Sequence, residues 1–214
     1  MKKVLLLASL LAFSVLGLSA QSFPVQFQGE KPNISDFAWA YVNYELAPAE
    51  DEDEEEGEGF YNESIGAVKN AMEKQRANKA QEPGVTLSID QRNGFVLYEW
   101  KDPDSSNRLR VEMCYWNESD GKHKIFACGV YYFDGDKYST GQFDGLTFYR
   151  YDNAAKTMTY ADDLGFDVEY STEDGAWVTY DLPRSGKNIT VTYWYDNGSK
   201  KQKTLQFDGR RFSF

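Results

Sequence analysis

The chain contains only one histidine, His123, among its 214 residues. A Ser-His-Asp or Cys-His set needs a histidine beside its nucleophile, and His123 stands between two lysines at a predicted turn, a poor place for a general base. The Gly-x-Ser-x-Gly, His-Glu-x-x-His, phosphate-loop and dinucleotide-binding motifs are all missing. No catalytic residue is therefore predicted, and the sequence favours a protein that is not an enzyme. A hydrolase that uses two carboxylates is the alternative, although no pattern selects a pair among the 34 acidic residues.

Cysteine is almost as scarce, with Cys114 and Cys128 alone. With so few His and Cys ligands we expect neither a metal site nor a cofactor. Each cysteine lies seven residues from Gly121, in strands predicted to pair across that turn. If the turn centres on Gly121, the two face each other and a cross-strand disulfide forms. A shift of one residue would instead place them on opposite faces, as two small buried hydrophobic residues.

Positive charge is in deficit, because 23 Lys and Arg face 34 Asp and Glu for a net charge of −11. Phosphate contact needs a basic face, so nucleic-acid binding is disfavoured. Residues 50–58 contain eight of the acidic side chains. Such a run repels itself and cannot bury apolar surface, so we expect a solvated, mobile loop over 47–59. Loose binding of calcium or of a cationic partner is the alternative, but the glycine-punctuated spacing of a calcium loop is missing.

Long apolar runs are missing except for residues 4–18. Lys2 and Lys3 precede this run, and Leu18-Ser19-Ala20 follows it with small residues. This arrangement predicts a secretory signal peptide over 1–20, cleaved after Ala20, and the run is too short for a membrane-spanning helix. We therefore expect a soluble exported protein, periplasmic or secreted, with no transmembrane segment in the mature chain.

What the chain does have is aromatic side chains, 16% of all residues, and these suit the half-buried surface of a sheet. From residue 85 onward, apolar and polar residues alternate with the period of a strand. Short polar turns separate the alternating segments into pairs. The expected hairpins are 85–90 with 95–100, 108–116 with 124–133, 146–151 with 156–160, 166–170 with 176–180, and 187–195 with 200–212.

The last hairpin has the clearest signal, because Asn197-Gly198 suits a turn whose central residues need positive φ. Its second arm ends in a Phe-Asp-Gly motif with an aromatic residue beyond it, a pattern that occurs over 133–138, 143–148 and 207–212. We interpret the three motifs as turns or bulges in preference to ligand sites. They are consistent both with a degenerate duplication and with two meanders that share turn chemistry.

The N-terminal part predicts two helices, over 33–46 and over 62–80. Asn33 and Asn62 are suitable caps, and Asp36 lies where a carboxylate favours the positive end of a helix. A strand is the competing interpretation for the first segment. The fold class expected is α+β, mainly antiparallel β in a sandwich or meander of about ten strands, with the two helices packed on it. Residues 21–82 and 83–214 then form one domain.

Adjacent aromatic residues recur in the predicted strands, for example Tyr115-Trp116 and Tyr193-Trp194-Tyr195. Neighbours in a strand point to opposite faces, so one ring of each group leaves the main core. Either a second layer such as the helices covers those rings, or they form an exposed surface suited to sugars or to a protein partner. The candidate ligand-binding residues are Trp116, Tyr132, Tyr149 and Trp194.

The ending Ser-Ala-Gln of the signal segment and the terminal Tyr-Trp-Tyr-Asp-Asn-Gly and Phe-Asp-Gly-Arg-Arg-Phe resemble small exported proteins of unknown function from Gram-negative gut and oral bacteria. This resemblance implies no activity. The function expected is that of an exported, non-enzymatic binding or structural protein of the cell envelope, with a glycan or an envelope protein as partner. The alternative is a hydrolase that acts on glycans through carboxylates.

Overall fold

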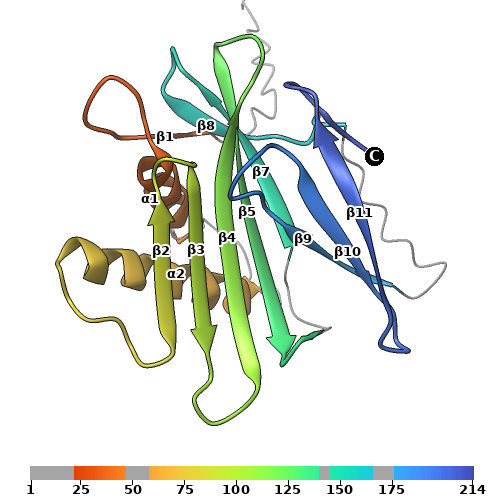
Figure 1. The fold of residues 1–214 in the computed structure, drawn as a ribbon. Coiled ribbons are helices and arrows are strands. Elements are labelled where there is room, and N and C mark those ends of the chain that lie inside the picture. Colours follow the sequence, from red (N-terminus) through yellow and green to blue (C-terminus); the bar gives the residue numbers. More distant parts are fainter. Residues whose placement is uncertain (1–21, 47–57, 140–144, 166–175) are drawn as a thin grey trace, which may run out of the picture.

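The computed structural model describes residues 22–46, 58–139, 145–165 and 176–214 (Figure 1). Several expectations fall outside these ranges: the signal peptide, most of the acidic loop, the hairpin arm over 166–170, and the start of the Phe-Asp-Gly motif at 143. Within the described residues the fold class is confirmed as mainly antiparallel β with two helices. The elements are β1 (Ser22–Pro24), α1 (Ile34–Glu45), α2 (Glu58–Arg76), β2 (Val85–Asp90), β3 (Phe95–Lys101), β4 (Asn107–Asn117), β5 (His123–Asp134), β6 (Lys137–Tyr138), β7 (Gly145–Asp152), β8 (Thr157–Tyr160), β9 (Trp177–Asp181), β10 (Ile189–Trp194), β11 (Lys200–Phe207) and β12 (Phe212–Ser213).

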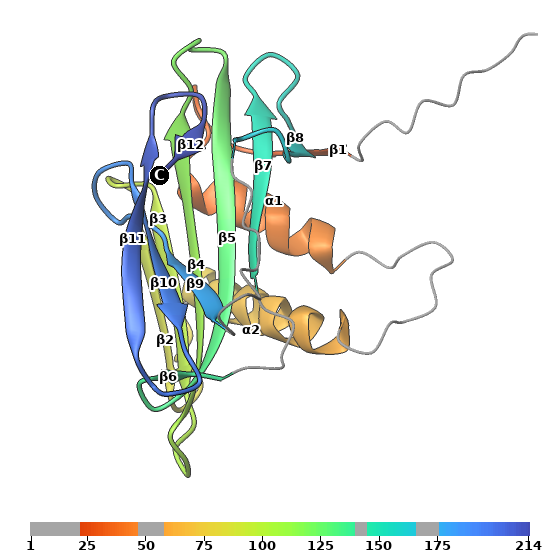
Figure 2. The same ribbon diagram turned by 90° about the vertical axis from the view of Figure 1, so that its right-hand side faces the viewer.

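The strands form two open sheets rather than one continuous meander. The eight-stranded sheet has the order β1-β8-β7-β5-β4-β3-β2, with β6 paired to β5, and the four-stranded sheet has the order β12-β11-β10-β9. Strands β1 and β2 lie at opposite edges of the large sheet, and the chain between them contains both helices. Both helices share one hydrophobic core with the large sheet, and the small sheet shares a second core with its opposite face (Figure 2).

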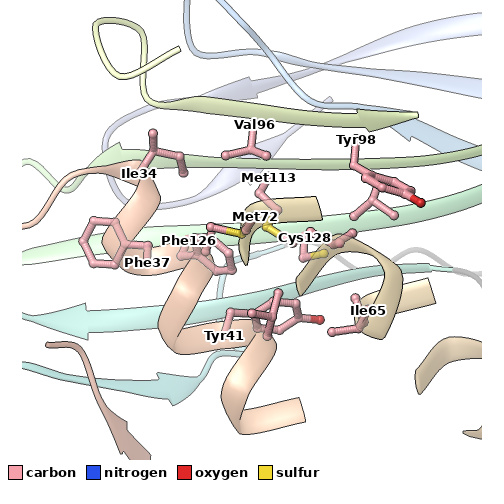
Figure 3. Close-up of a cluster of buried hydrophobic side chains, with 14 of the residues drawn as sticks. Ile34, Phe37, Tyr41, Ile65, Met72, Val96, Tyr98, Met113, Phe126 and Cys128 are labelled. Carbon is pink, nitrogen blue, oxygen red and sulfur yellow. The ribbon is translucent and has the colours of Figure 1, made fainter. Parts of the chain in front are cut away.

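The large sheet is apolar on both faces, and strand β5 illustrates why. Phe126 and Cys128 belong to the core that the helices cover, whereas Ile125 and Ala127 belong to the core shared with the small sheet. Phe126 packs against Tyr41 of α1, with ring centroids 5.3 Å apart, in the cluster drawn in Figure 3. Residues that alternate along a strand thus supply two separate hydrophobic layers, which accounts for the high aromatic content.

Helix α1 begins as its sequence predicts. The Asn33 side chain accepts a hydrogen bond from the Ser35 N–H at 2.8 Å, and the Asp36 carboxylate accepts one from the Asn33 N–H at 2.9 Å. These two bonds form a capping box, which satisfies amide groups that the helix itself leaves unpaired.

Helix α2 differs from the expected bounds at both ends. It begins at Glu58, so Asn62 lies within the helix and does not cap it. It ends at Arg76 because Asn78 adopts a left-handed conformation with φ 52°, and the Lys79 N–H donates to the Lys74 carbonyl at 2.8 Å. This is a Schellman motif, in which asparagine sometimes takes the left-handed position that glycine usually occupies.

The expected disulfide is wrong, because the β4–β5 register differs by one residue from the one assumed. Cys114 pairs with Ala127 and Cys128 pairs with Met113, so the hairpin centres between Asp120 and Gly121. The two cysteines then point to opposite faces of the large sheet, one into each core, and both are free and buried. Burial raises the pKa of both thiols.

The described Phe-Asp-Gly motifs form tight turns. Phe207 pairs with Phe212 across the last turn, and the Asp208 carboxylate accepts hydrogen bonds from the N–H groups of Arg210 and Arg211, both at 2.7 Å. Gly209 has φ 104°, and its carbonyl oxygen accepts a hydrogen bond from the Ser119 N–H at 2.8 Å. This contact joins the turn of the small sheet to the β4–β5 turn of the large one.

Candidate functional site

The four ring residues expected to bind a ligand do not share a surface. Trp116 is 5% exposed and lies between the sheets, where its indole N–H donates to the Lys187 carbonyl at 2.9 Å. Trp194 is half-buried against the same core, and its indole N–H donates to the Thr179 hydroxyl at 2.9 Å. Both indoles therefore already have polar partners inside the protein.

Tyr132 and Tyr149 lie on the opposite face, under the helices. Tyr149 is buried, and its hydroxyl donates to the Glu45 carboxylate of α1 at 2.6 Å. Tyr132 is half-buried, and its hydroxyl is 3.0 Å from that of Ser64 on α2. The second layer thus covers these rings, and Tyr132 also lines a hollow in the surface.

One hollow that could take a small ligand lies between α2 and the first strands of the large sheet. We call it the α2 hollow: its volume is about 310 Å³, and it is lined by Glu63, Ser64, Ala67, Asn70, Ala71, Lys74, Gln81, Glu82, Val85, Tyr98, Trp100, Leu109 and Tyr132. Among its lining residues Tyr98 and Leu109 are buried, and Trp100 and Tyr132 are half-buried. Ligand sites commonly combine such apolar walls with a few polar groups, and this volume is at the lower end of their usual range.

The side chains of α2 explain why this space exists. Ser64, Ala67 and Ala71 recur at helical spacing and line the hollow, so this part of the helix presents small side chains to the sheet. The neighbouring stripe of Ile65 and Met72 is fully buried in the core. The helix is therefore held on the sheet by its large residues while its small ones leave a recess.

The polar groups of the α2 hollow differ in whether they have a hydrogen-bond or ion-pair partner within the protein. The Gln81 amide nitrogen donates to the Ala71 carbonyl at 2.9 Å, which fixes the orientation of the amide. The Gln81 Oε1 is buried and accepts no hydrogen bond from the described residues. Lys74 and Glu82 form an ion pair at the rim. Burial, with a smaller effect from nearby Tyr132, raises the pKa of Tyr98 to about 12, so this phenol stays neutral.

A second, more polar hollow of about 470 Å³ lies where the two sheets meet at their turns. His123 is one of its lining residues: the Asp120 carboxylate is 2.5 Å from Nδ1, and the carboxylate of the neighbouring Asp152 is 3.7 Å from Nε2. Arg150 lies beside them and contacts Glu118 at 3.2 Å and Asp163 at 2.8 Å. The hydrogen bond from His123 lowers the pKa of Asp120 to about 2.

The ligand atoms of Glu118, Asp120 and His123 lie within 4.8 Å of one another, a spacing that could hold a metal ion. Two observations count against that use. Arg150 already neutralises Glu118, and a guanidinium beside a ligand disfavours a second cation. Asp120 also accepts the N–H groups of Lys122 at 2.7 Å and His123 at 3.0 Å through its other oxygen, as in an ordinary Asx turn. The group is therefore best described as a network that ties turns together.

A third hollow of about 380 Å³ lies beside α1 and β1 and includes Trp39. Its aromatic faces are already partly occupied within the protein. The Arg76 guanidinium lies 3.9 Å from the centre of the Trp39 ring, and Phe23 stacks on Tyr44 at 4.0 Å. These contacts favour a role in holding α1, α2 and β1 together.

Sequence reasoning missed most of the α2 hollow, including Tyr98, Trp100 and Gln81. The available signal was the recurrence of small residues at 64, 67 and 71 within an otherwise amphipathic helix. No pattern in the residues around Gln81 indicates its role, because that role depends on a hydrogen bond to a carbonyl ten residues earlier in α2.

No protein-family model matches the chain, and comparisons with curated proteins and with solved structures give no match. Neither helix in the described part of the chain combines the length and apolar character needed to cross a bilayer.

Proposed function

We propose that this chain is an exported, non-enzymatic binding or structural protein of the cell envelope, and that the α2 hollow is its ligand site. The observation that carries the proposal is the Gln81 Oε1, a buried acceptor without a partner among the described residues, in a recess with aromatic walls. Buried polar atoms are nearly always paired in folded proteins, so this atom suits a donor supplied from outside. The ligand is a glycan or a segment of an envelope protein.

The two other hollows support binding less well. Ion pairs connect the charged groups around His123, and intramolecular ring contacts occupy aromatic faces around Trp39. In the α2 hollow, by contrast, Trp100 and Tyr132 are half-buried beside small helix residues. Aromatic rings that keep one accessible side are the usual means of holding apolar or sugar surfaces.

The test is a ligand-observed NMR screen of a fragment library on the whole chain and on two variants. Ala67→Leu fills the hollow with a side chain that helices accept readily, and Trp177→Ala removes a ring that is 39% exposed on β9, outside the hollow. We expect a set of fragments that Ala67→Leu loses and Trp177→Ala keeps. A library that gives no hits sensitive to Ala67→Leu, while thermal unfolding shows that variant to be folded, refutes the proposal.

Export to the periplasm or the exterior is the second part of the proposal, and it depends on residues 1–20. Lys2, Lys3 and the apolar run up to Leu18 motivate it. Expression of the whole chain in a Gram-negative host should give a product that begins at Gln21 outside the cytoplasm. Mass spectrometry that finds only the uncleaved chain in the cytoplasm would remove this part.

The polar hollow supports a second candidate, a hydrolase that acts on glycans through carboxylates. It contains Glu118, Asp120 and Asp163, and glycoside hydrolysis needs two such groups across the bond that breaks. Arg150 contacts Glu118 and Asp163. A chromogenic glycoside panel tests the idea: hydrolysis that Glu118→Gln and Asp163→Asn abolish supports it, and no turnover above the uncatalysed rate rejects it.

A further inference from the structure

The chemistry of the α2 hollow narrows the class of ligand further than the proposed function does, and the inference rests on that function. We infer that the hollow binds one residue of a neutral carbohydrate, with an apolar sugar face against Trp100 and a hydroxyl group that donates to the Gln81 Oε1. Four properties of the lining lead to this ligand class: hydrogen-bond polarity, charge, ring surface and size.

The hydrogen-bonding capacity of the lining favours a donor-rich ligand. Gln81 presents its amide oxygen, because the Ala71 carbonyl already accepts from the amide nitrogen at 2.9 Å. Glu63 adds an exposed carboxylate at the rim, which is also an acceptor. A carbohydrate offers several hydroxyl donors in a small volume, whereas an aliphatic ligand would leave the Gln81 oxygen unpaired.

Charge at the rim argues against an acidic ligand. Glu63 and Glu82 are the acidic residues of the lining, and Lys74, its one basic residue, is paired with Glu82. An added carboxylate or phosphate would meet a surplus of negative charge without an unpaired cation in the lining. A uronic acid or a phosphorylated sugar is therefore disfavoured relative to a neutral one.

The ring surface and the size agree with this class. Trp100 and Tyr132 are half-buried, so each keeps accessible surface beside the recess. The face of an aromatic ring carries a partial negative charge, which attracts the C–H groups on the apolar side of a sugar. A volume of about 310 Å³ is at the lower end of the usual range for ligand pockets, which suits one sugar residue better than a folded peptide segment.

The experiment titrates the whole chain with three classes of trisaccharide and follows tryptophan fluorescence and binding heat. The neutral class comprises the trisaccharides of glucose, galactose, mannose and N-acetylglucosamine; trigalacturonate is the anionic probe and tri-glucosamine the cationic one. We expect at least one neutral probe to bind and the anionic probe not to bind. Trp100→Ala should weaken binding about tenfold and Gln81→Met about fivefold, whereas Trp177→Ala should leave it unchanged.

Ala67→Leu provides an independent variant in case Gln81→Met unfolds, because it fills the hollow without removing a polar group. Binding of a charged probe in preference to every neutral one, with loss in Ala67→Leu, overturns the inference but leaves the proposed binding site in place. The inference also fails, and the binding site again stands, if fragments bind in the hollow and no neutral trisaccharide does. If neither fragments nor sugars respond to Ala67→Leu, both the inference and the proposed function fail.

Discussion

Protonation of Glu112 should make the protein more stable in mildly acidic solution than at neutral pH. Glu112 lies on β4, facing the small sheet, and is 8% exposed. Its carboxylate accepts the Leu182 N–H at 2.8 Å, and its nearest cation is Arg110 at 3.8 Å. Arg110 makes a shorter contact of 2.7 Å with Asp181. Burial therefore outweighs attraction to Arg110 and raises the pKa of Glu112 from 4.5 to about 6.

The direction of the effect follows from which state binds the proton more tightly. The pKa in the folded protein lies above that of the unfolded chain, so the free energy of unfolding rises as the pH falls from about 6 toward about 4.5. The shift corresponds to a gain of about 1.5 kcal/mol between about pH 7 and about pH 4.5. Turn aspartates such as Asp120, whose pKa is lowered to about 2, have the opposite effect on stability. They lower the free energy of unfolding only at still lower pH, where the same carboxylates begin to take up protons in the unfolded chain.

The assay is urea unfolding at several pH values for the wild type, Glu112→Gln and the control Glu73→Gln, which alters an exposed carboxylate on α2. Glutamine keeps an oxygen for the Leu182 N–H but cannot ionise. The gain in stability on acidification should therefore disappear in Glu112→Gln and persist in Glu73→Gln. The quantity to compare is the free energy of unfolding of the wild type minus that of Glu112→Gln. If this value is constant with pH, the burial argument is wrong. If it increases with pH, attraction to Arg110 governs the carboxyl group instead.

Three further predictions concern the helices and the two cores. Asn33→Ala removes the side-chain half of the capping box and should lower the free energy of unfolding by about 1 kcal/mol in urea titration; no change would mean that Asp36 alone suffices. Phe126→Ala empties a fully buried position beside Tyr41 and should cost about 3–5 kcal/mol, so a loss below about 1 kcal/mol would contradict the packing described. Cys114 and Cys128 should resist a thiol reagent in the folded protein and both react in denaturant without reductant, because they are buried and unbridged; failure to react after unfolding would indicate a disulfide.

The strands could be predicted because their signals are local. The hairpin of β2 and β3 has the bounds that alternation and the Asn93-Gly94 turn predicted, within one residue. The β4–β5 hairpin was also predicted, but not its register. Glycine marks a turn without fixing which turn position it occupies, and here the hairpin centre lies before Gly121 and not on it. This shift of half a residue in the hairpin centre changes the register by one residue, which decides the face of the sheet to which each cysteine points. The wrong prediction of a disulfide therefore follows from a small uncertainty in the turn.

The site could not be predicted in the same way, because the wall residues come from several elements that no pattern connects. Tyr98, Leu109 and Tyr132 lie on three adjacent strands, and Gln81 lies in the loop after α2. Adjacent aromatic residues were a poor guide, since both faces of the large sheet are covered and most rings serve a core. Trp100 has charged neighbours on both sides and belongs to no aromatic pair, so no pattern in the sequence distinguishes it.

The coverage of both faces also bears on the proposal that the α2 hollow is a ligand site. A sheet that is buried on two sides leaves the helix layer little freedom, and larger residues at Ala67 or Ala71 could fill the recess. Filling a recess of this kind usually stabilises a protein by about 1 kcal/mol. The small side chains therefore forgo stability, and Gln81 adds a buried oxygen that lacks a partner among the described residues. Both features agree with the proposal that the recess takes a donor-bearing ligand.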